Sequence, residues 1–214
     1  MRVALINEFS QAAKNPIVHK MLVEATQGKQ IDVYNLGMEN VDERPEITYI
    51  HLGLMASILL TSKAVDFVVT GCGTGQGACI SLNNYPNVLC GLLVDPADAY
   101  LFSQINNGNA ASIPYAKGFG WGAELNIKFI FEKLFLEPRG EGYPPERKEP
   151  QQRNARILNE VKKVVNNDLM QILKTIDPEF VRTIFSNKKF NDLFFTYSQN
   201  AEMNLWLSEF LKNE

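Results

Sequence analysis

The chain has 214 residues, of which 45% are hydrophobic and 21% are charged, and its formal net charge is −3. These values are typical of a globular protein, and the scattered Lys and Arg residues exclude a basic surface for nucleic acid. No apolar run approaches the roughly 18 residues needed to span a bilayer, so we expect no membrane partner.

The sequence begins directly with a strand pattern, without the charged, apolar and small-residue layout of a signal peptide. Its three cysteines, Cys72, Cys79 and Cys90, are odd in number and show no paired framework. Reduced thiols and a cytoplasmic location are therefore expected. With only two histidines and no CxxC pair, no zinc site is predicted.

The first two-thirds of the chain alternates between two hydrophobic periodicities. In chain order they predict a strand over 2–7, a helix over 15–26, a strand over 31–37, a helix over 49–63, strands over 65–71 and 89–95, a helix over 98–108, a strand over 111–116 and a helix over 121–136. Strands that alternate with helices predict an α/β domain over residues 1–136, with a five-stranded parallel sheet covered on both faces.

A change of composition follows this domain. Residues 137–153 are rich in Pro, Gly and charge, which predicts a linker or arm. Residues 154–214 then form an all-helical extension, with helices predicted over 154–176, 177–187 and 190–211. About 60 residues are too few for a confident independent core, so this extension is expected to pack on the sheet domain or on a partner subunit.

The stretch "TGCGTGQGA", residues 70–78, places four glycines and a cysteine directly after the apolar strand of residues 65–71. Glycines let the backbone adopt positive φ and approach a ligand, and successive amides before a helix present partial positive charge. In this setting Cys72 is a candidate base or nucleophile, because such amides favour a thiolate. The alternative is a small buried residue that fits a tight turn.

The stretch shares its glycines with two kinds of nucleotide-binding loop, the Walker A loop and the dinucleotide-binding loop. A Walker A loop requires Lys followed by Ser or Thr, and Gly77 is followed by Ala78 and Cys79. The dinucleotide pattern fits better, since residues 73–78 read G-x-G-x-x-A and Asp95 ends the next strand. However, the following helix is short and the loop follows the third strand, so no nucleotide cofactor is expected.

The segment "CGTGQGACISLNN", residues 72–84, resembles the signature of the type B ribose-5-phosphate isomerases and the related galactose-6-phosphate isomerase subunits. Residues 105–122 and 150–156 show weaker similarity to other segments of this family. The resemblance implies a flavodoxin-like, doubly wound sheet in a homodimer, or a tetramer, with active sites at the subunit interface. It implies aldose–ketose isomerisation of a sugar phosphate through a cis-enediolate, without a metal or another cofactor.

The resemblance also implies roles for individual residues. Cys72 matches the family's base, Thr74 would assist proton transfer between oxygens, and Glu8 would stand in for the acid that ends the first strand. The amides of the loop would hold the developing oxyanion, at roughly 3 kcal/mol per good donor. The implied substrate-binding residues are Gly73, Gly75, Gly77, Asn83, Asn106, Asn109 and Tyr49, with Arg147 and Arg153 for the phosphate.

Two family histidines, which serve ring opening and phosphate contact, fall on Phe9 and Ile105 in this chain. His51 either lines the pocket or is structural, and the two arginines either bind phosphate or are solvated linker charges. The departures leave open an unphosphorylated sugar or a sugar acid as substrate. A sugar-binding protein without turnover is a third possibility, which the presence of both Cys72 and Thr74 disfavours.

Overall fold

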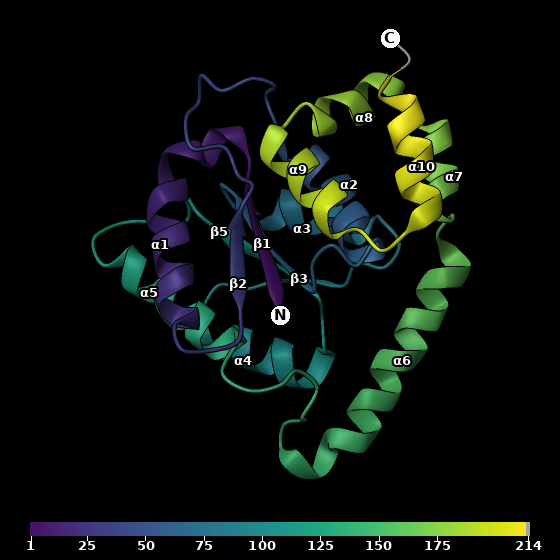
Figure 1. Cartoon of the computed structure of the whole chain (residues 1–214). Helices are drawn as coiled ribbons and strands as arrows, with labels where there is room; N and C mark the ends of the chain where they lie inside the picture. Colours follow the sequence, from purple (N-terminus) through teal and green to yellow (C-terminus); the bar gives the residue numbers. More distant parts are fainter. Residues whose placement is uncertain (213–214) are drawn as a thin grey trace.

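The computed structural model describes residues 1–212 as a three-layer α/β structure with helices appended to it (Figure 1). The strands are β1 (Arg2–Asn7), β2 (Asp32–Asn35), β3 (Phe67–Cys72), β4 (Cys90–Leu92) and β5 (Ala110–Pro114). The helices of the sheet domain are η1 (Phe9–Lys14), α1 (Asn15–Thr26), α2 (Tyr49–Thr61), α3 (Gln76–Asn83), α4 (Pro96–Leu101), η2 (Phe102–Asn106) and α5 (Ala123–Leu134). This arrangement confirms the α/β, flavodoxin-like class predicted from the alternating pattern.

All five strands are parallel, in the order β2-β1-β3-β5-β4. Because β5 rather than β4 pairs with β3, Cys72 at the end of β3 lies opposite Pro114 at the end of β5. The loops that follow these two strands therefore lie side by side at the carboxyl edge of the sheet.

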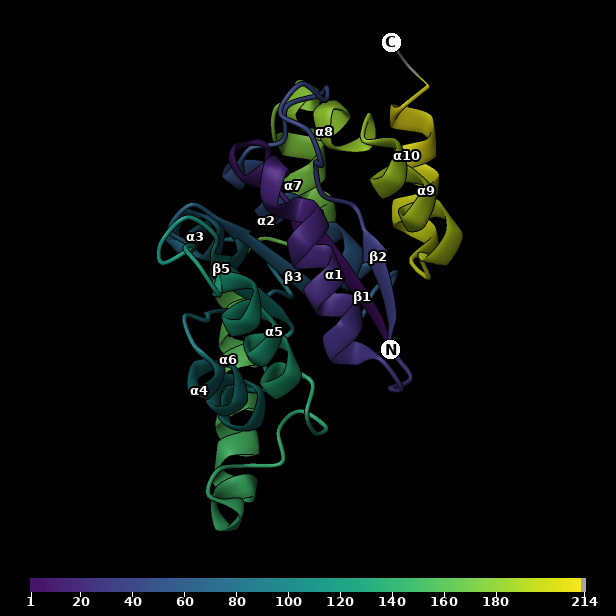
Figure 2. The same cartoon turned by 90° about the vertical axis from the view of Figure 1, so that its left-hand side faces the viewer.

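Helices cover both faces of the sheet (Figure 2). One apolar cluster joins β1, β3 and β5 to α1, α4 and α5, and a second cluster lies between the opposite face and α2 and α3. Every residue of β3 is buried, as expected for a central strand covered on both sides.

The C-terminal extension consists of η3 (Pro145–Arg147), α6 (Lys148–Val165), α7 (Leu169–Thr175), α8 (Pro178–Phe185), α9 (Lys188–Tyr197) and α10 (Ala201–Phe210). The single helices predicted over 154–176 and 190–211 are wrong, since each is broken into two. Asp168 accepts a hydrogen bond from the Met170 N–H and Asn200 accepts one from the Met203 N–H. Such N-caps start a new helix, which the apolar periodicity alone does not reveal.

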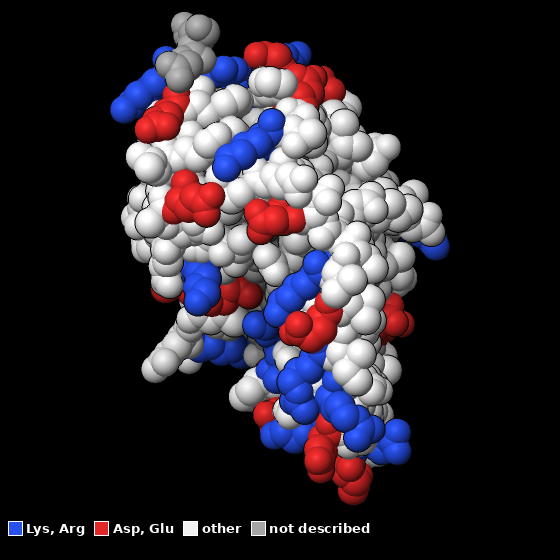
Figure 3. All heavy atoms as spheres, turned by 90° about the vertical axis from the view of Figure 1, so that its right-hand side faces the viewer, with Lys and Arg blue, Asp and Glu red and all other residues white. Residues whose placement is uncertain are grey.

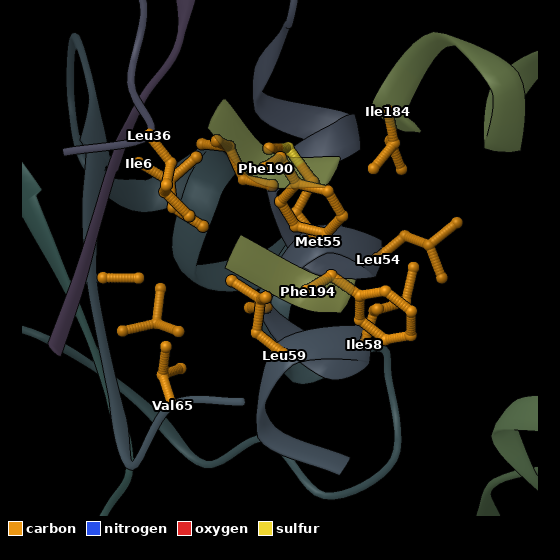
Figure 4. Packing of buried hydrophobic residues seen from close by; sticks show 14 of the residues in the cluster. Ile6, Leu36, Leu54, Met55, Ile58, Leu59, Val65, Ile184, Phe190 and Phe194 are labelled. Atoms are coloured by element: carbon orange, nitrogen blue, oxygen red, sulfur yellow. The ribbon is translucent and has the colours of Figure 1, made fainter. Parts of the chain in front are cut away.

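The extension from α7 onward packs against α2. Phe190 and Phe194 of α9 and Ile184 of α8 join the same buried cluster as Met55 and Ile58 of α2 (Figure 4). Residues 51–59 of α2 are all buried, so this helix is covered on its whole circumference. The extension thus completes the core of the sheet domain.

The N-terminus of α2 is also tied to the extension, through His51. Its Nδ1 accepts a hydrogen bond from the Thr48 N–H at 3.0 Å, and its ring stacks on Phe180 of α8 with centroids 4.5 Å apart. Burial lowers the pKa of His51 below its ordinary value of 6.5. This histidine is therefore a neutral helix cap.

Helix α6 differs from the other helices because it extends along the outside of the molecule, as seen at the lower right of Figure 1. It begins at Lys148, inside the segment predicted as a linker, and Ala155 is its only buried residue. Figure 3 shows Lys and Arg side chains gathered on the side of the molecule that carries this helix. None of the helices within residues 1–212 combines the length and apolarity needed to cross a membrane.

The shared core predicts that the extension and the sheet domain unfold together. Phe194→Ala should lower the free energy of unfolding by about 3–5 kcal/mol, because the side chain is fully buried and its loss leaves a cavity. Phe195→Ala is the control, because the Phe195 side chain is 38% exposed and its removal should lower the free energy of unfolding by only about 1 kcal/mol. Urea unfolding followed by far-UV circular dichroism measures both, and a separate early transition in the Phe194 variant would contradict the shared core.

The lowered pKa of His51 predicts a pH-dependent stability. The unfolded chain binds the proton more tightly, so this residue's contribution is complete above the unfolded pKa of 6.5 and falls as the pH drops towards the folded pKa. His51→Gln keeps a cap acceptor without a titrating group, so its stability should fall less between about pH 7.5 and pH 5 than that of the wild type. His19→Gln is the control, and the stability of both variants is measured by thermal unfolding across this pH range. If the stabilities of the two variants depended equally on pH, the assignment to His51 would be contradicted.

Candidate functional site

The neighbouring strands β1 and β3 end side by side at the carboxyl edge of the sheet, and the chain leaves them towards opposite sides of the sheet. The chain leaves β1 towards β2 on one side, and β3 lies on the other side of β1. Ligands bind at such switch points in open α/β sheets. Asn7 pairs with Gly71 in this register, so the next residues along the two strands, Glu8 and Cys72, lie at the same point of the edge.

The glycine loop has a backbone that only glycine fits at two positions. A Cβ on Gly71 would lie 2.2 Å from the Ile113 carbonyl oxygen. Gly75 adopts a φ of +71°, and a Cβ there would lie 2.6 Å from Leu92. These glycines allow β3, β5 and the start of α3 to approach closely, which fixes the loop.

Hydrogen bonds from β5 and the loop after it hold the glycine loop in place. The Tyr115 N–H donates to the Cys72 carbonyl at 3.0 Å, and the Ala116 N–H donates to the Gly73 carbonyl at 2.9 Å. The buried Ser112 hydroxyl donates to the Gly75 carbonyl at 2.6 Å. The carbonyls of Cys72, Gly73 and Gly75 are thus all bound by β5 or by the loop after it.

Several loop amides remain open to a ligand. Among residues 1–212, the N–H groups of Gly73, Thr74 and Gly77 have no backbone acceptor. The Cys72 thiol beside them is 8% exposed, and the Thr74 side chain is exposed. A thiol next to open amides at the start of α3 can act as a base towards a bound substrate whose oxygen the amides hold.

The segment after β1 adds polar groups to this edge. Glu8 is 2% exposed, and its carboxylate accepts hydrogen bonds from the Ser10 N–H at 2.9 Å and the Ser10 hydroxyl at 2.5 Å. Ser10 in turn accepts from the Gln11 amide at 3.0 Å. A short chain of hydrogen bonds therefore connects the buried acid to the surface of the site.

Lys14 and Gln11 are candidate functional residues that sequence reasoning missed. The Lys14 ammonium donates to Gln11 at 2.9 Å and to the Tyr115 carbonyl at 2.5 Å, and it lies 4.6 Å from the centre of the Phe119 ring. Burial lowers the pKa of Lys14. The residues that Lys14 contacts in the loop after β5 are far away in the sequence, so only the fold reveals this cation.

Tyr49 lies over the other side of the glycine loop. A Cβ on Gly77 would lie 3.2 Å from its ring, and Tyr49 is 48% exposed. The ring borders a mainly apolar groove of about 560 Å³ between α2, α3 and the extension, lined also by Ile80, Tyr85, Ile176 and Phe180. The extension thus reaches the edge of the site.

Two of the expected substrate-binding asparagines have side chains bound to the protein. Asn83 bridges α3 and β4, donating to the Cys90 carbonyl at 2.9 Å and accepting from the Cys90 N–H at 3.0 Å. Asn109 precedes β5 and bonds to the Leu89 N–H and the Asn87 carbonyl. Asn109 lies at the amino edge of the sheet, away from the glycine loop.

The remaining expected residues form a second group at a distance from Cys72 in the same chain. Asn106 ends η2, where its neighbour Asn107 contacts Gly140 at the start of the arm. Arg147 and Arg153 lie exposed on η3 and the first turns of α6. The structure therefore brings together Glu8, the glycine loop and Tyr49, but not these three residues. Within residues 1–212 no group of three His, Cys, Asp or Glu residues is placed to hold a metal ion.

Two family models match the chain, one over the sheet domain and one over the helical extension. A family model described as ribose/galactose isomerase matches residues 3–137, and a second model, described as ribose-5-phosphate isomerase, matches residues 164–210. No curated protein matches the chain.

Solved structures match over nearly the whole length. A crystal structure of 4-deoxy-L-threo-5-hexosulose-uronate ketol-isomerase with a tartrate is 50% identical with a TM-score of 0.96, covering 99% of this chain and 100% of that one. A ribose-5-phosphate isomerase from Vibrio parahaemolyticus is 53% identical with a TM-score of 0.95, covering 99% of both chains. The type B ribose 5-phosphate isomerase from Trypanosoma cruzi is 20% identical with a TM-score of 0.63, covering 76% of this chain and 98% of that one, and shows a related fold.

The family model spans more than half of the chain, including the glycine loop and Cys72, and the matches confirm the resemblance found in the sequence. The chain belongs to the ribose/galactose isomerase family, whose members are enzymes that interconvert aldoses and ketoses.

Proposed function

We propose that the chain is a ketol-isomerase of an open-chain sugar acid, a 4-deoxy-5-hexosulose-uronate, with Cys72 as the base. The observation that carries the proposal is the position of Cys72 at the sheet switch point, directly before loop residues whose N–H groups have no backbone acceptor within residues 1–212. The identity of 50% to a uronate ketol-isomerase over 99% of the chain supports the substrate class.

The proposed reaction moves a carbonyl from C1 to C2 without an external oxidant. The Cys72 thiolate removes the proton from C2, and the electron pair forms the C1–C2 double bond of an enediolate. The amides of Gly73, Thr74 and Gly77 stabilise the negative charge that develops on O1. Thr74 assists transfer of the O2 proton to O1, and Cys72 returns its proton to C1, which leaves a ketone at C2.

The substrate argument rests on ring chemistry. An aldohexose closes its ring through the hydroxyl on C4 or C5, but a 4-deoxy-5-ulose has neither hydroxyl. Such a substrate needs no ring opening by the enzyme. The positions of the family's two histidines are occupied here by Phe9, which packs against the core, and Ile105. Their absence fits a substrate that is already open.

The two arginines proposed to bind the anionic end of the substrate, Arg147 and Arg153, lie on η3 and α6, away from the glycine loop of the same chain. A second copy of the chain would supply them. Helix α6 carries a stripe of exposed aliphatic side chains next to Arg153: Ile157, Leu158, Val161, Val164 and Val165 are 49–86% exposed. Such a stripe on a nearly unburied helix favours a subunit interface. A homodimer would bring Arg153 to the partner's site, where its fork suits a carboxylate.

Ribose 5-phosphate is the second candidate substrate. It is favoured by the 53% identity to the Vibrio parahaemolyticus ribose-5-phosphate isomerase and by the second family model. The same base and amides would serve this reaction, and the arginines would bind the phosphate. The two candidates therefore differ in ring opening and in the anionic group.

The deciding experiment follows both sugars by NMR in heavy water. We expect ketose formation with deuterium beside the carbonyl from the uronate at least about tenfold faster than from ribose 5-phosphate. Cys72→Ala should lower kcat by about 10²- to 10⁴-fold, because it removes the base. Cys79→Ser is the control thiol substitution, and its turnover should stay close to that of the wild type. A preference for ribose 5-phosphate would overturn the uronate assignment, and an active Cys72→Ala variant would overturn the base.

The proposed dimer predicts a loss of assembly when charge enters the α6 stripe. Val161→Lys with Val164→Lys should give a monomer by analytical ultracentrifugation and lower kcat/KM by about tenfold or more, because the arginines no longer reach the site. Leu205→Lys is the control, since this exposed aliphatic residue lies on α10. An unchanged oligomer, or a fully active monomer, would contradict the shared site.

A further inference from the structure

Two thiols that the isomerase reaction does not use lie together behind the glycine loop. Cys79 is in the first turns of α3 and is half-buried, and Cys90 begins β4 and is 7% exposed. The Cys79 thiol donates to the Cys90 carbonyl oxygen at 3.6 Å, and the Cys90 thiol donates to the Gly91 carbonyl oxygen at 3.7 Å. The two side chains are close enough for each to shift the pKa of the other. Both cysteines are free in this structure.

Asn83 fixes the two cysteines relative to each other. Its amide nitrogen lies 2.9 Å from the Cys90 carbonyl, 3.1 Å from the Cys79 carbonyl and 3.5 Å from the Cys79 sulfur. Its amide oxygen accepts from the Cys90 N–H. The thiol pair is thus held between a helix and a strand by one side chain.

The two thiols differ in acidity and exposure. The neighbouring Cys90 side chain, together with a hydrogen bond from the Asn83 amide, lowers the pKa of Cys79 to about 7 against the effect of burial. The neighbouring Cys79 side chain and deeper burial raise the pKa of the Cys90 thiol well above its ordinary value. A half-exposed thiol that titrates near neutral pH is the better attacking group in disulfide exchange.

Lys162 of α6 lies next to this pair. Its ammonium donates to the carbonyls of Asn83 and Val88, and it acts electrostatically on Cys90. Among residues 1–212 no salt bridge is formed by this lysine. Its charge favours the thiolate of Cys90 once Cys79 no longer carries a negative charge.

We propose that Cys79 and Cys90 form a redox-active dithiol site that reacts with small-molecule disulfides such as glutathione disulfide. The Cys79 thiolate attacks one sulfur of glutathione disulfide, forming a mixed disulfide and releasing one glutathione, which takes up a proton. Cys90 then loses its proton and attacks the Cys79 sulfur, forming the Cys79–Cys90 disulfide and releasing the second glutathione. Two protein thiols are oxidised, and one glutathione disulfide is reduced to two glutathiones.

The test is intact-mass and peptide mass spectrometry of the full reduced chain after incubation with glutathione disulfide. The wild type should lose the mass of two hydrogen atoms, yield a peptide pair joined through Cys79 and Cys90, and return to its initial mass with dithiothreitol. A wild-type protein that stays unmodified, keeps a bound glutathione, or is cross-linked through Cys72 would overturn the proposal. This readout needs no turnover, so it is independent of the proposed isomerase function.

Variants separate the two roles within the pair. Cys90→Ser should trap one glutathione on Cys79, because the resolving thiol is missing, and Cys90→Ala should do the same. Cys79→Ser should leave Cys90 unmodified, since Cys90 is buried. Cys72→Ser is the control and should still form the Cys79–Cys90 disulfide. Equal trapping of glutathione in the Cys79 and Cys90 variants would contradict the assigned order of attack.

Discussion

The burial of α2 on all sides is the constraint on which the rest of the structure depends. Its residues 51–59 are buried without interruption, so a sheet on one side alone cannot cover it. The sheet, α3 and the C-terminal helices each supply part of the cover. A Cβ on Gly53 of α2 would lie 2.4 Å from the Ser81 carbonyl of α3, which shows how closely these helices pack. Because α3 begins at the glycine loop, the packing of the extension bears indirectly on the position of the site.

The strand order has a chemical consequence. With β5 beside β3, the loop after β5 bonds the carbonyls of the glycine loop and leaves amides open next to the Cys72 thiol. In the proposed mechanism, proton transfer and oxyanion binding would both be supplied by this one sheet edge. The two arginines that the family resemblance assigns to the anionic group of the substrate are on the arm, away from this edge. In the proposed homodimer, substrate binding and chemistry would come from different subunits, so catalysis would depend on assembly.

The sequence predicted the alternating domain and the glycine loop well, because buried parallel strands and loop glycines leave strong local patterns. It predicted the helical extension but not its breaks, since the caps Asp168 and Asn200 compete with a continuous apolar pattern. Asn83 fits the family signature, yet its amide bridges α3 to β4. An asparagine side chain can hydrogen-bond a ligand or the protein backbone equally well, so the residue type alone does not show which of the two roles it has. Lys14 depends on contacts across the sheet and has no local signal.

The position of α2 in the chain has a consequence during synthesis. This helix is made early, while α8 and α9, which cover it, are made near the end. At ordinary rates of translation its apolar surface waits on the order of ten seconds for the C-terminal segment to emerge. During that time the nascent chain exposes an apolar helix, which is the kind of segment that chaperones hold. For the same reason, a messenger truncated after α6 would yield an aggregating product rather than a smaller working enzyme.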